Sequence, residues 1–250
     1  MVHAVNAERI KLLSTKSPYW CVAIVAVVAI LFSVLIGLGN STSSAGTSVY
    51  VSDLTVGMTQ IGVVVLMIMA VLAVTSEFRF GTIRTTFQAI PSRETVLGAK
   101  AVVYGGVAVV VSFVVGIVSM VLGKALSGDS GGRLDLAGSE AIRQYWGIPV
   151  YTLLCILIGL GIGAIVRQSA GAIVVLLIWS LVLENILINI PKVKVVAPYM
   201  PFTNASRFLT DRGSDGIDYV WNAYGSILYF AVVALVIFGI GVVLTKKRDA

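Results

Sequence analysis

Long apolar segments separated by shorter polar ones set the pattern of this chain. Six of the apolar segments are about 20 residues long, the length that a helix needs to cross the hydrocarbon core of a bilayer. They cover residues 19–38, 55–75, 101–122, 148–166, 171–190 and 223–244. Their apolar residues are continuous and do not alternate with polar ones, which favours helices over a transmembrane barrel. The pattern predicts an all-α membrane protein with six transmembrane helices in one domain of residues 1–250.

The composition agrees with this class. Of the 250 residues 58% are hydrophobic and 12% are charged, and the mean hydropathy is +0.97, more than a soluble core absorbs. The net charge of +6 would suit nucleic acid, but the basic residues are scattered between apolar segments without interleaved aromatic residues. Nucleic-acid binding is therefore disfavoured. Cys21 and Cys155 lie within apolar segments and are interpreted as packing residues.

The Lys and Arg residues predict the orientation of the six spans. When the spans are threaded through a membrane, most of the 18 Lys and Arg residues fall on the side that holds the N-terminus. Cytoplasmic segments of membrane proteins carry the excess of Lys and Arg. Because six crossings return the chain to its starting side, both termini are predicted to be cytoplasmic.

The N-terminal tail and the predicted external segments differ in character. Residues 2–18 mix apolar and charged residues up to Pro18, as an interfacial helix on membrane lipid does, and a frayed basic tail is the alternative. The external segments are 39–54, 123–147 and 191–222. The last of these is too apolar for a simple solvated loop, which favours short re-entrant helices.

Residues 76–98 connect the second and third spans and are longer than the roughly 2 to 8 residues that a helical connection needs. Apolar residues recur there near the spacing of a helical turn, and charged residues occupy other faces. The apolar residues are Phe78, Ile83, Phe87 and Ile90, and the charged ones are Glu77, Arg79, Arg84 and Arg93. This predicts a short amphipathic helix along the cytoplasmic surface that Pro91 breaks. A basic helix that only binds anionic lipid is the alternative.

The order of residues in this connection, Glu77-Phe78-Arg79, then residues 81–86, 91–93 and Lys100, resembles the cytoplasmic segment of type 2 ABC exporter permeases, especially the small six-span permeases of actinobacteria. Three further features are similar. These are Glu8, Lys11 and Leu12 ahead of an aromatic pair, then Gly159, Gly161, Gly163, Arg167, Gln168 and Ala170, and finally the closing residues 246–250. The resemblance implies an exporter in the bacterial plasma membrane.

The same resemblance implies the partners. The connection would be a coupling helix that rests in a groove of a separate ABC ATPase. Its contact residues would be Glu77, Phe78, Arg79, Thr82, Arg84, Phe87 and Arg93. Two ATPase copies and a second permease copy or a homologous permease would complete the complex, with the translocation path between the two permeases.

Catalytic chemistry is not expected in this chain. The Gly123-Lys124 pair lacks the remaining residues of a G-x-x-x-x-G-K-[ST] loop, so ATP and Mg²⁺ are expected on the partner ATPase. The sole histidine is His3 in the tail, and the spans hold no Cys/His or paired-carboxylate constellation. We therefore expect no catalytic residue, no metal site and no cofactor here.

Glu184 is the one formal charge inside a predicted span, and Asn185 and Asn189 lie near it. An ionisable group within a span ordinarily faces a cavity or a partner. Two hypotheses remain open: a contact in the translocation path, or a hydrogen-bonding hub that ties the end of the fifth span to the external segment.

The sequence thus favours the permease subunit of an ATP-driven exporter of amphipathic or hydrophobic, drug-like or lipid-like substrates. An ion-coupled secondary transporter that uses Glu184 as its proton carrier is one alternative. A non-transporting membrane scaffold or sensor is another.

Overall fold

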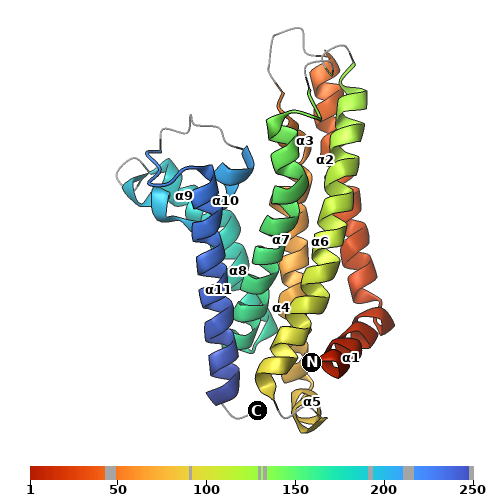
Figure 1. Ribbon diagram of the computed structural model, residues 1–250, viewed down its shortest axis with the longest axis vertical. Coiled ribbons are helices and arrows are strands. Elements are labelled where there is room, and N and C mark those ends of the chain that lie inside the picture. Colours follow the sequence, from red (N-terminus) through yellow and green to blue (C-terminus); the bar gives the residue numbers. More distant parts are fainter. Residues whose placement is uncertain are drawn as a thin grey trace. The chain divides into compact units, whose positions relative to one another are not determined.

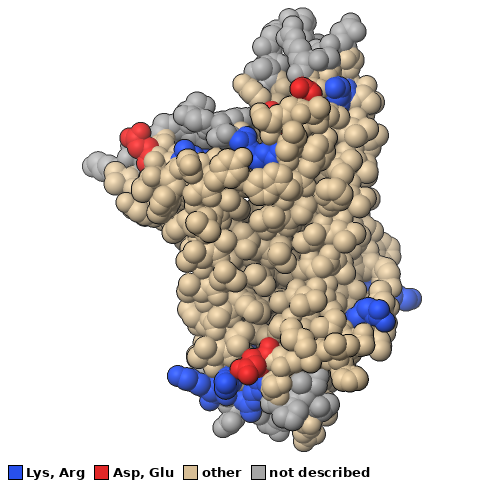
Figure 2. Space-filling model, in the orientation of Figure 1, with Lys and Arg blue, Asp and Glu red and all other residues tan. Residues whose placement is uncertain are grey.

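The computed structural model describes residues 1–42, 49–89, 92–128, 131, 134–190, 194–210 and 217–247. Every regular element in these ranges is a helix, and six helical stretches are long and apolar enough to cross a membrane. They are Ser17–Ser41, Gly57–Arg79, Arg93–Leu126, Ser139–Val166, Ser169–Asn189 and Ala223–Lys247. The prediction of an all-α membrane protein with six transmembrane helices is confirmed. On the face shown in Figure 2, Lys, Arg, Asp and Glu gather near the helix ends, and uncharged residues cover the lengths between.

The chain forms two compact units, and three long helices contribute to both. Unit 1 contains Met1–Ser14, Met67–Gly106 and Leu153–Ala250, and unit 2 contains Thr15–Leu66 and Val107–Thr152. The shared helices are α4 (Val63–Arg79), α6 (Arg93–Leu126) and α7 (Ser139–Val166).

Unit 2 is built on α2 (Ser17–Thr42), the short helix α3 (Val51–Leu54) and the π-helical turn η1 (Gly57–Gly62). Small residues bring α2 close to α6, because a β-carbon on Gly37 would lie 2.7 Å from the carbonyl oxygen of Gly123. The carboxylate of Glu140 accepts the backbone N–H of Ser52 at 3.0 Å, which ties the start of α3 to α7.

Unit 1 contains the remaining helices, which Figure 1 shows together with α4, α6 and α7. They are α1 (Val2–Ser14), α5 (Ile83–Ala89), α8 (Ser169–Leu177), η3 (Ile178–Leu183), α9 (Glu184–Asn189), η4 (Lys194–Tyr199), α10 (Pro201–Thr210) and α11 (Ala223–Lys247). The segment from α8 to α9 is one continuous helix with a π-helical stretch, η3, in its middle.

Glycines on two faces of α7 pack it against α4 and α11. A β-carbon on Gly159 would lie 2.8 Å from the carbonyl oxygen of Met67 in α4, and one on Gly161 would lie 2.8 Å from that of Ile237 in α11. Both distances are closer than a side chain permits, so only glycine allows these backbones to approach. This packing places α7 directly against α4 and α11.

Several helices are longer than the predicted spans. The second span continues to Arg79, and the third begins at Arg93 within the predicted 76–98 connection. Residues 139–146, predicted as part of an external segment, form the first two turns of α7. In the 191–222 segment the structure has two short helices, η4 and α10.

Candidate functional site

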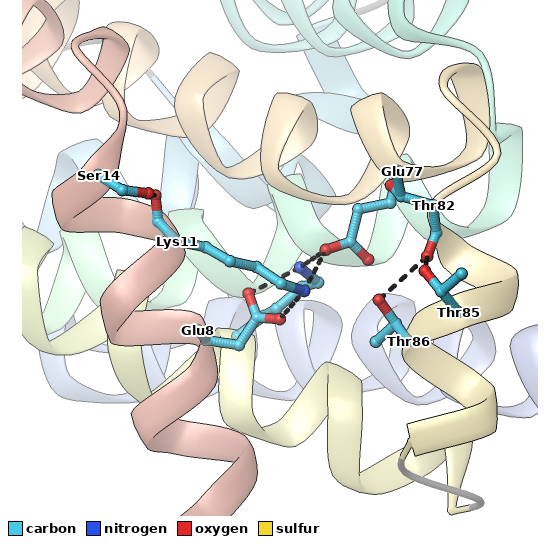
Figure 3. A network of polar contacts seen from close by, with 8 residues as sticks. Glu8, Lys11, Ser14, Glu77, Thr82, Thr85 and Thr86 are labelled. Carbon is cyan, nitrogen blue, oxygen red and sulfur yellow. Dashed lines mark hydrogen bonds and ion pairs between the residues drawn. The ribbon is translucent and has the colours of Figure 1, made fainter.

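Four charged side chains meet where α1, α4 and α6 come together. The Nζ of Lys100 donates to Glu8 Oε2 and to Glu77 Oε1, each at 2.8 Å. The Nζ of Lys11 donates to Glu8 Oε1 at 2.9 Å and to Glu77 Oε1 at 2.8 Å (Figure 3). We name Glu8, Lys11, Glu77 and Lys100 the charge quartet. It joins three helices through two cations and two carboxylates.

The charge quartet is buried on most sides. The exposed fractions are 1% for Lys100, 3% for Glu8 and 8% for Glu77. An isolated charge at such depth is strongly disfavoured, so the four groups depend on one another. Ala4, Glu8 and Leu12 are the buried residues of α1, and their spacing of four puts them on one face of that helix. The quartet therefore holds α1 by its buried face.

Lys11 is the most exposed member of the charge quartet. Partial burial lowers the pKa of its ammonium group, but hydrogen bonds to Glu77 and Glu8 raise this pKa by more, and the net pKa lies above the usual value for lysine. Because the folded-state pKa is raised, the stability that Lys11 adds is present at neutral pH and is lost only as the pH rises through that pKa.

An exposed turn begins two residues after Glu77 of the charge quartet. Helix α4 ends at Arg79, and the next residue, Phe80, is 72% exposed. Gly81 has a φ of +69°, a conformation that glycine adopts without strain. The carbonyl of Thr82 accepts the hydroxyls of Thr85 at 2.8 Å and Thr86 at 3.2 Å, which fixes the start of α5 (Figure 3). We name residues 79–82, the last residue of α4 and the three turn residues after it, the exposed turn.

The predicted single amphipathic helix over this connection is therefore wrong in its continuity. Phe78 belongs to α4 and Ile83 to α5, and the exposed turn separates them. The hydrophobic pattern predicted neither the break nor the exposure of Phe80. Gly81 was the available signal, because glycine is disfavoured in a helix interior and common in turns.

The residues predicted to contact an ATPase fall into distinct places. Glu77 lies in the charge quartet, and Arg79 and Thr82 lie in the exposed turn. Arg93 begins α6 and donates from its Nη1 to the carbonyl of Thr245 in α11 at 3.2 Å. The backbone at Arg84 and Phe87 is part of α5; their side chains, and Ile90 and Pro91, lie outside the described residues.

Phe78, the remaining predicted contact residue, packs under Arg167. The guanidinium carbon of Arg167 lies 4.8 Å from the centre of the Phe78 ring, within the range of a cation–π interaction. Nη2 of Arg167 also donates to the carbonyl of Leu244 in α11 at 3.4 Å. Arg167 has a φ of 59°, a left-handed conformation that costs a non-glycine residue about 1–2 kcal/mol.

Glu184 lies at the end of unit 1 that contains α9 and α10. Its carboxylate accepts the backbone N–H groups of Phe202 at 3.1 Å and Thr203 at 2.7 Å, and the Thr203 hydroxyl at 2.9 Å. These N–H groups belong to the first turn of α10, which has no partners within its own helix. Glu184 is 2% exposed and acts as the cap of α10. The geometry favours the hypothesis of a hydrogen-bonding hub.

Asn185 and Asn189 do not join Glu184 in that hub. Both are exposed, and each donates to the backbone of its own helix: Asn185 to the carbonyl of Leu181 at 2.8 Å and Asn189 to that of Asn185 at 2.7 Å. A residue that the sequence did not indicate, Asn204, completes the junction. Its Nδ2 donates to the carbonyls of Pro198 at 2.7 Å and Met200 at 2.9 Å.

The chain has no match among protein-family models or among curated proteins. Within the described part of the chain, no group of three or more His, Cys, Asp or Glu side chains is placed to hold a metal ion.

Replacing Lys100 with methionine removes the most buried cation of the charge quartet and leaves Glu8 and Glu77 with Lys11 alone. We expect Lys100→Met to lower the free energy of unfolding by about 3 kcal/mol, since breaking a buried ion pair leaves an uncompensated charge. SDS-induced unfolding in detergent micelles measures the change. The matched control is Lys246→Met, because the Lys246–Glu94 pair is 68% and 55% exposed at its two side chains. An equal effect of the two variants would contradict the dependence on burial.

Replacing Glu184 with glutamine places an amide N–H₂ where α10 presents its own N–H donors. We expect Glu184→Gln to speed amide hydrogen exchange in residues 201–210 by about tenfold, because a buried donor loses its acceptor. Exchange followed by mass spectrometry measures this rate. Asn185→Ala is the control, since its exposed side chain donates to the carbonyl of Leu181 in its own helix. Unchanged exchange in α10 of Glu184→Gln would rule out the capping interaction.

Proposed function

We propose that this chain is the permease subunit of an ATP-driven ABC exporter, and that the exposed turn together with α5 is the surface on which a separate ATPase docks. The observation that carries the proposal is the charge quartet beside the exposed turn. A solvent-facing aromatic residue stands three residues from a buried carboxylate that is bonded to α1 and α6. The exposed residue can receive a force from a partner and the buried carboxylate can pass it to α1 and α6, so that this segment acts as a lever.

The base of this lever is stiff for a physical reason. Glu77 lies in the last turn of α4, and its Oε1 binds a cation from α1 and a cation from α6. Moving α4 alone would separate buried opposite charges, which is costly. A force on α5 would therefore move the ends of all three helices together, and such coupled shifts switch transporters between states.

The tip of the lever suits a protein partner. Phe80 is 72% exposed, and the guanidinium of Arg79 lies 5.6 Å from the centre of its ring. Aromatic and arginine side chains are the residues that most often anchor protein interfaces. A groove on the ATPase would receive Phe80, with Thr82, Thr85 and Gln88 at its polar rim, all of them exposed.

The remaining parts of the proposal follow from this one. The ATPase side would be the cytoplasm of a bacterial cell, with both termini of the chain on it and ATP and Mg²⁺ bound by two ATPase copies. In the helix from Ser169 to Asn189, 17% of the most apolar 18-residue stretch is buried within the chain, the lowest share among the six spans. A second permease copy or a homologue would cover it and enclose a path for amphipathic, drug-like or lipid-like substrates.

The geometry gives less support to a proton-coupled transporter. A proton-coupled transporter needs a carboxylate that exchanges protons with both sides, whereas the Glu184 carboxylate is engaged by two backbone N–H groups and a hydroxyl at the start of α10 and by the Trp179 side chain of η3. A non-transporting scaffold would have no effect on ATP hydrolysis by a bound subunit.

Phe80→Asp tests the docking surface directly. We expect about tenfold less ATPase to copurify with the affinity-tagged permease, and an equal loss of the ATP hydrolysis that the permease stimulates, because a charge replaces the apolar anchor. Val195→Asp is the matched control, since Val195 is 78% exposed and lies in η4. Wild-type permease that neither binds an ATPase nor changes its hydrolysis of Mg·ATP would sink the proposal.

A further inference from the structure

Arg167 occupies a position where glycine is the usual residue. The backbone N–H of Arg167 donates to the carbonyl of Gly163 at 2.9 Å, which closes the last turn of α7. The residue that follows a helix in a left-handed conformation is most often glycine, and Arg167 has a φ of 59°. A strained arginine persists where its side chain does something that glycine cannot.

The Arg167 side chain contacts two other helices. Its guanidinium lies over the ring of Phe78 at 4.8 Å, and its Nη2 donates at 3.4 Å to the carbonyl of Leu244 near the end of α11. A cation is favoured over an aromatic face and also at the carbonyl end of a helix. Arg167 thus joins α4 and α11 at the point where α7 passes into α8.

The last turn of α4 is consequently held in two directions. Glu77 and Phe78 are consecutive, and consecutive residues of an α-helix point about 100° apart. Glu77 binds the cations of α1 and α6, and Phe78 lies under Arg167. Next to them, the hydroxyl of Ser169 donates to that of Thr75 at 2.8 Å, a second contact between the start of α8 and α4.

We propose that Arg167 is a positioning residue for coupling, which carries a displacement of the exposed turn through Phe78 to α7, α8 and α11. This inference rests on the proposed function, in which an ATPase acts on the exposed turn. The charge quartet carries the same displacement to α1 and α6. Together, the charge quartet and Arg167 connect the end of α4 to α1, α6, α7, α8 and α11.

Arg167→Gly separates coupling from folding. Glycine removes the side chain and also relieves the strained backbone, so the melting temperature is expected to stay within about 3 °C of wild type. ATPase copurification is expected to stay within about twofold, because the exposed turn is intact, while the permease-stimulated hydrolysis of Mg·ATP falls about fivefold or more. Arg167→Lys keeps a cation over the ring and should restore at least half of the stimulation.

A second pair of variants tests the partner side chain. Phe78→Tyr keeps an aromatic face under Arg167 and should couple as wild type does, whereas Phe78→Leu keeps the apolar bulk, loses the ring and should behave as Arg167→Gly does. Wild-type stimulation in Arg167→Gly, or equal stimulation in the two Phe78 variants, would overturn the inference. Failure of the proposed function has a different signature, because wild-type permease itself would then have no effect on ATP hydrolysis.

Discussion

The buried carboxylate of Glu77, which pairs with two lysines, is the interaction on which the arrangement of α1, α4 and α6 depends. Glu77 Oε1 lies 2.8 Å from the ammonium groups of both Lys11 and Lys100. Its other oxygen, Oε2, is buried and accepts no hydrogen bond from any described residue. The bonds through Oε1 must therefore offset the desolvation of the whole carboxylate. This requirement fixes the positions of α1, α6 and the last turn of α4 relative to one another.

The exposed turn can transmit a force because the charge quartet holds the adjoining end of α4. A short helix on a flexible loop would bind a partner without moving the membrane-spanning helices. Here the chain leaves α4 at Arg79 and enters α6 at Arg93, and both helices carry a member of the charge quartet within two turns of these ends. Three turn residues, 80–82, lie between the end of α4 and the start of α5, so that α5 is joined to the charge quartet by a short connection. The same reasoning gives Arg167 its place, since it extends the base to α7 and α11.

The sequence predicted the class of fold because long continuous apolar segments leave few alternatives in a bilayer. It misplaced the end of the second span and the start of the third for one physical reason: the predicted spans stop just before Glu77 and begin just after Lys100, where a charge ordinarily marks the edge of the membrane. The structure continues both helices through these residues because the charges neutralise each other. The paired residues lie far apart in the chain: Lys11 and Glu77 are separated by 66 residues, and Glu8 and Lys100 by 92. No local pattern encodes such pairs. The sequence offers a hydrogen-bonding hub at Glu184 only as one of two hypotheses, and it does not indicate the capping of α10, since the acceptor and the donors lie on different helices.

The central claim is that α1 and α5 move as one body with the end of α4. Spin labels at Ile10, which is 63% exposed on α1, and at Gln88, exposed on α5, report on it through their distance distribution by pulsed electron paramagnetic resonance. The measurement compares the proposed complex with an ABC ATPase in the nucleotide-free state and in the state trapped with ADP and vanadate. The account predicts one narrow distribution that is the same in both states. A distribution that shifts between the two states, or that is broad in either, would contradict it.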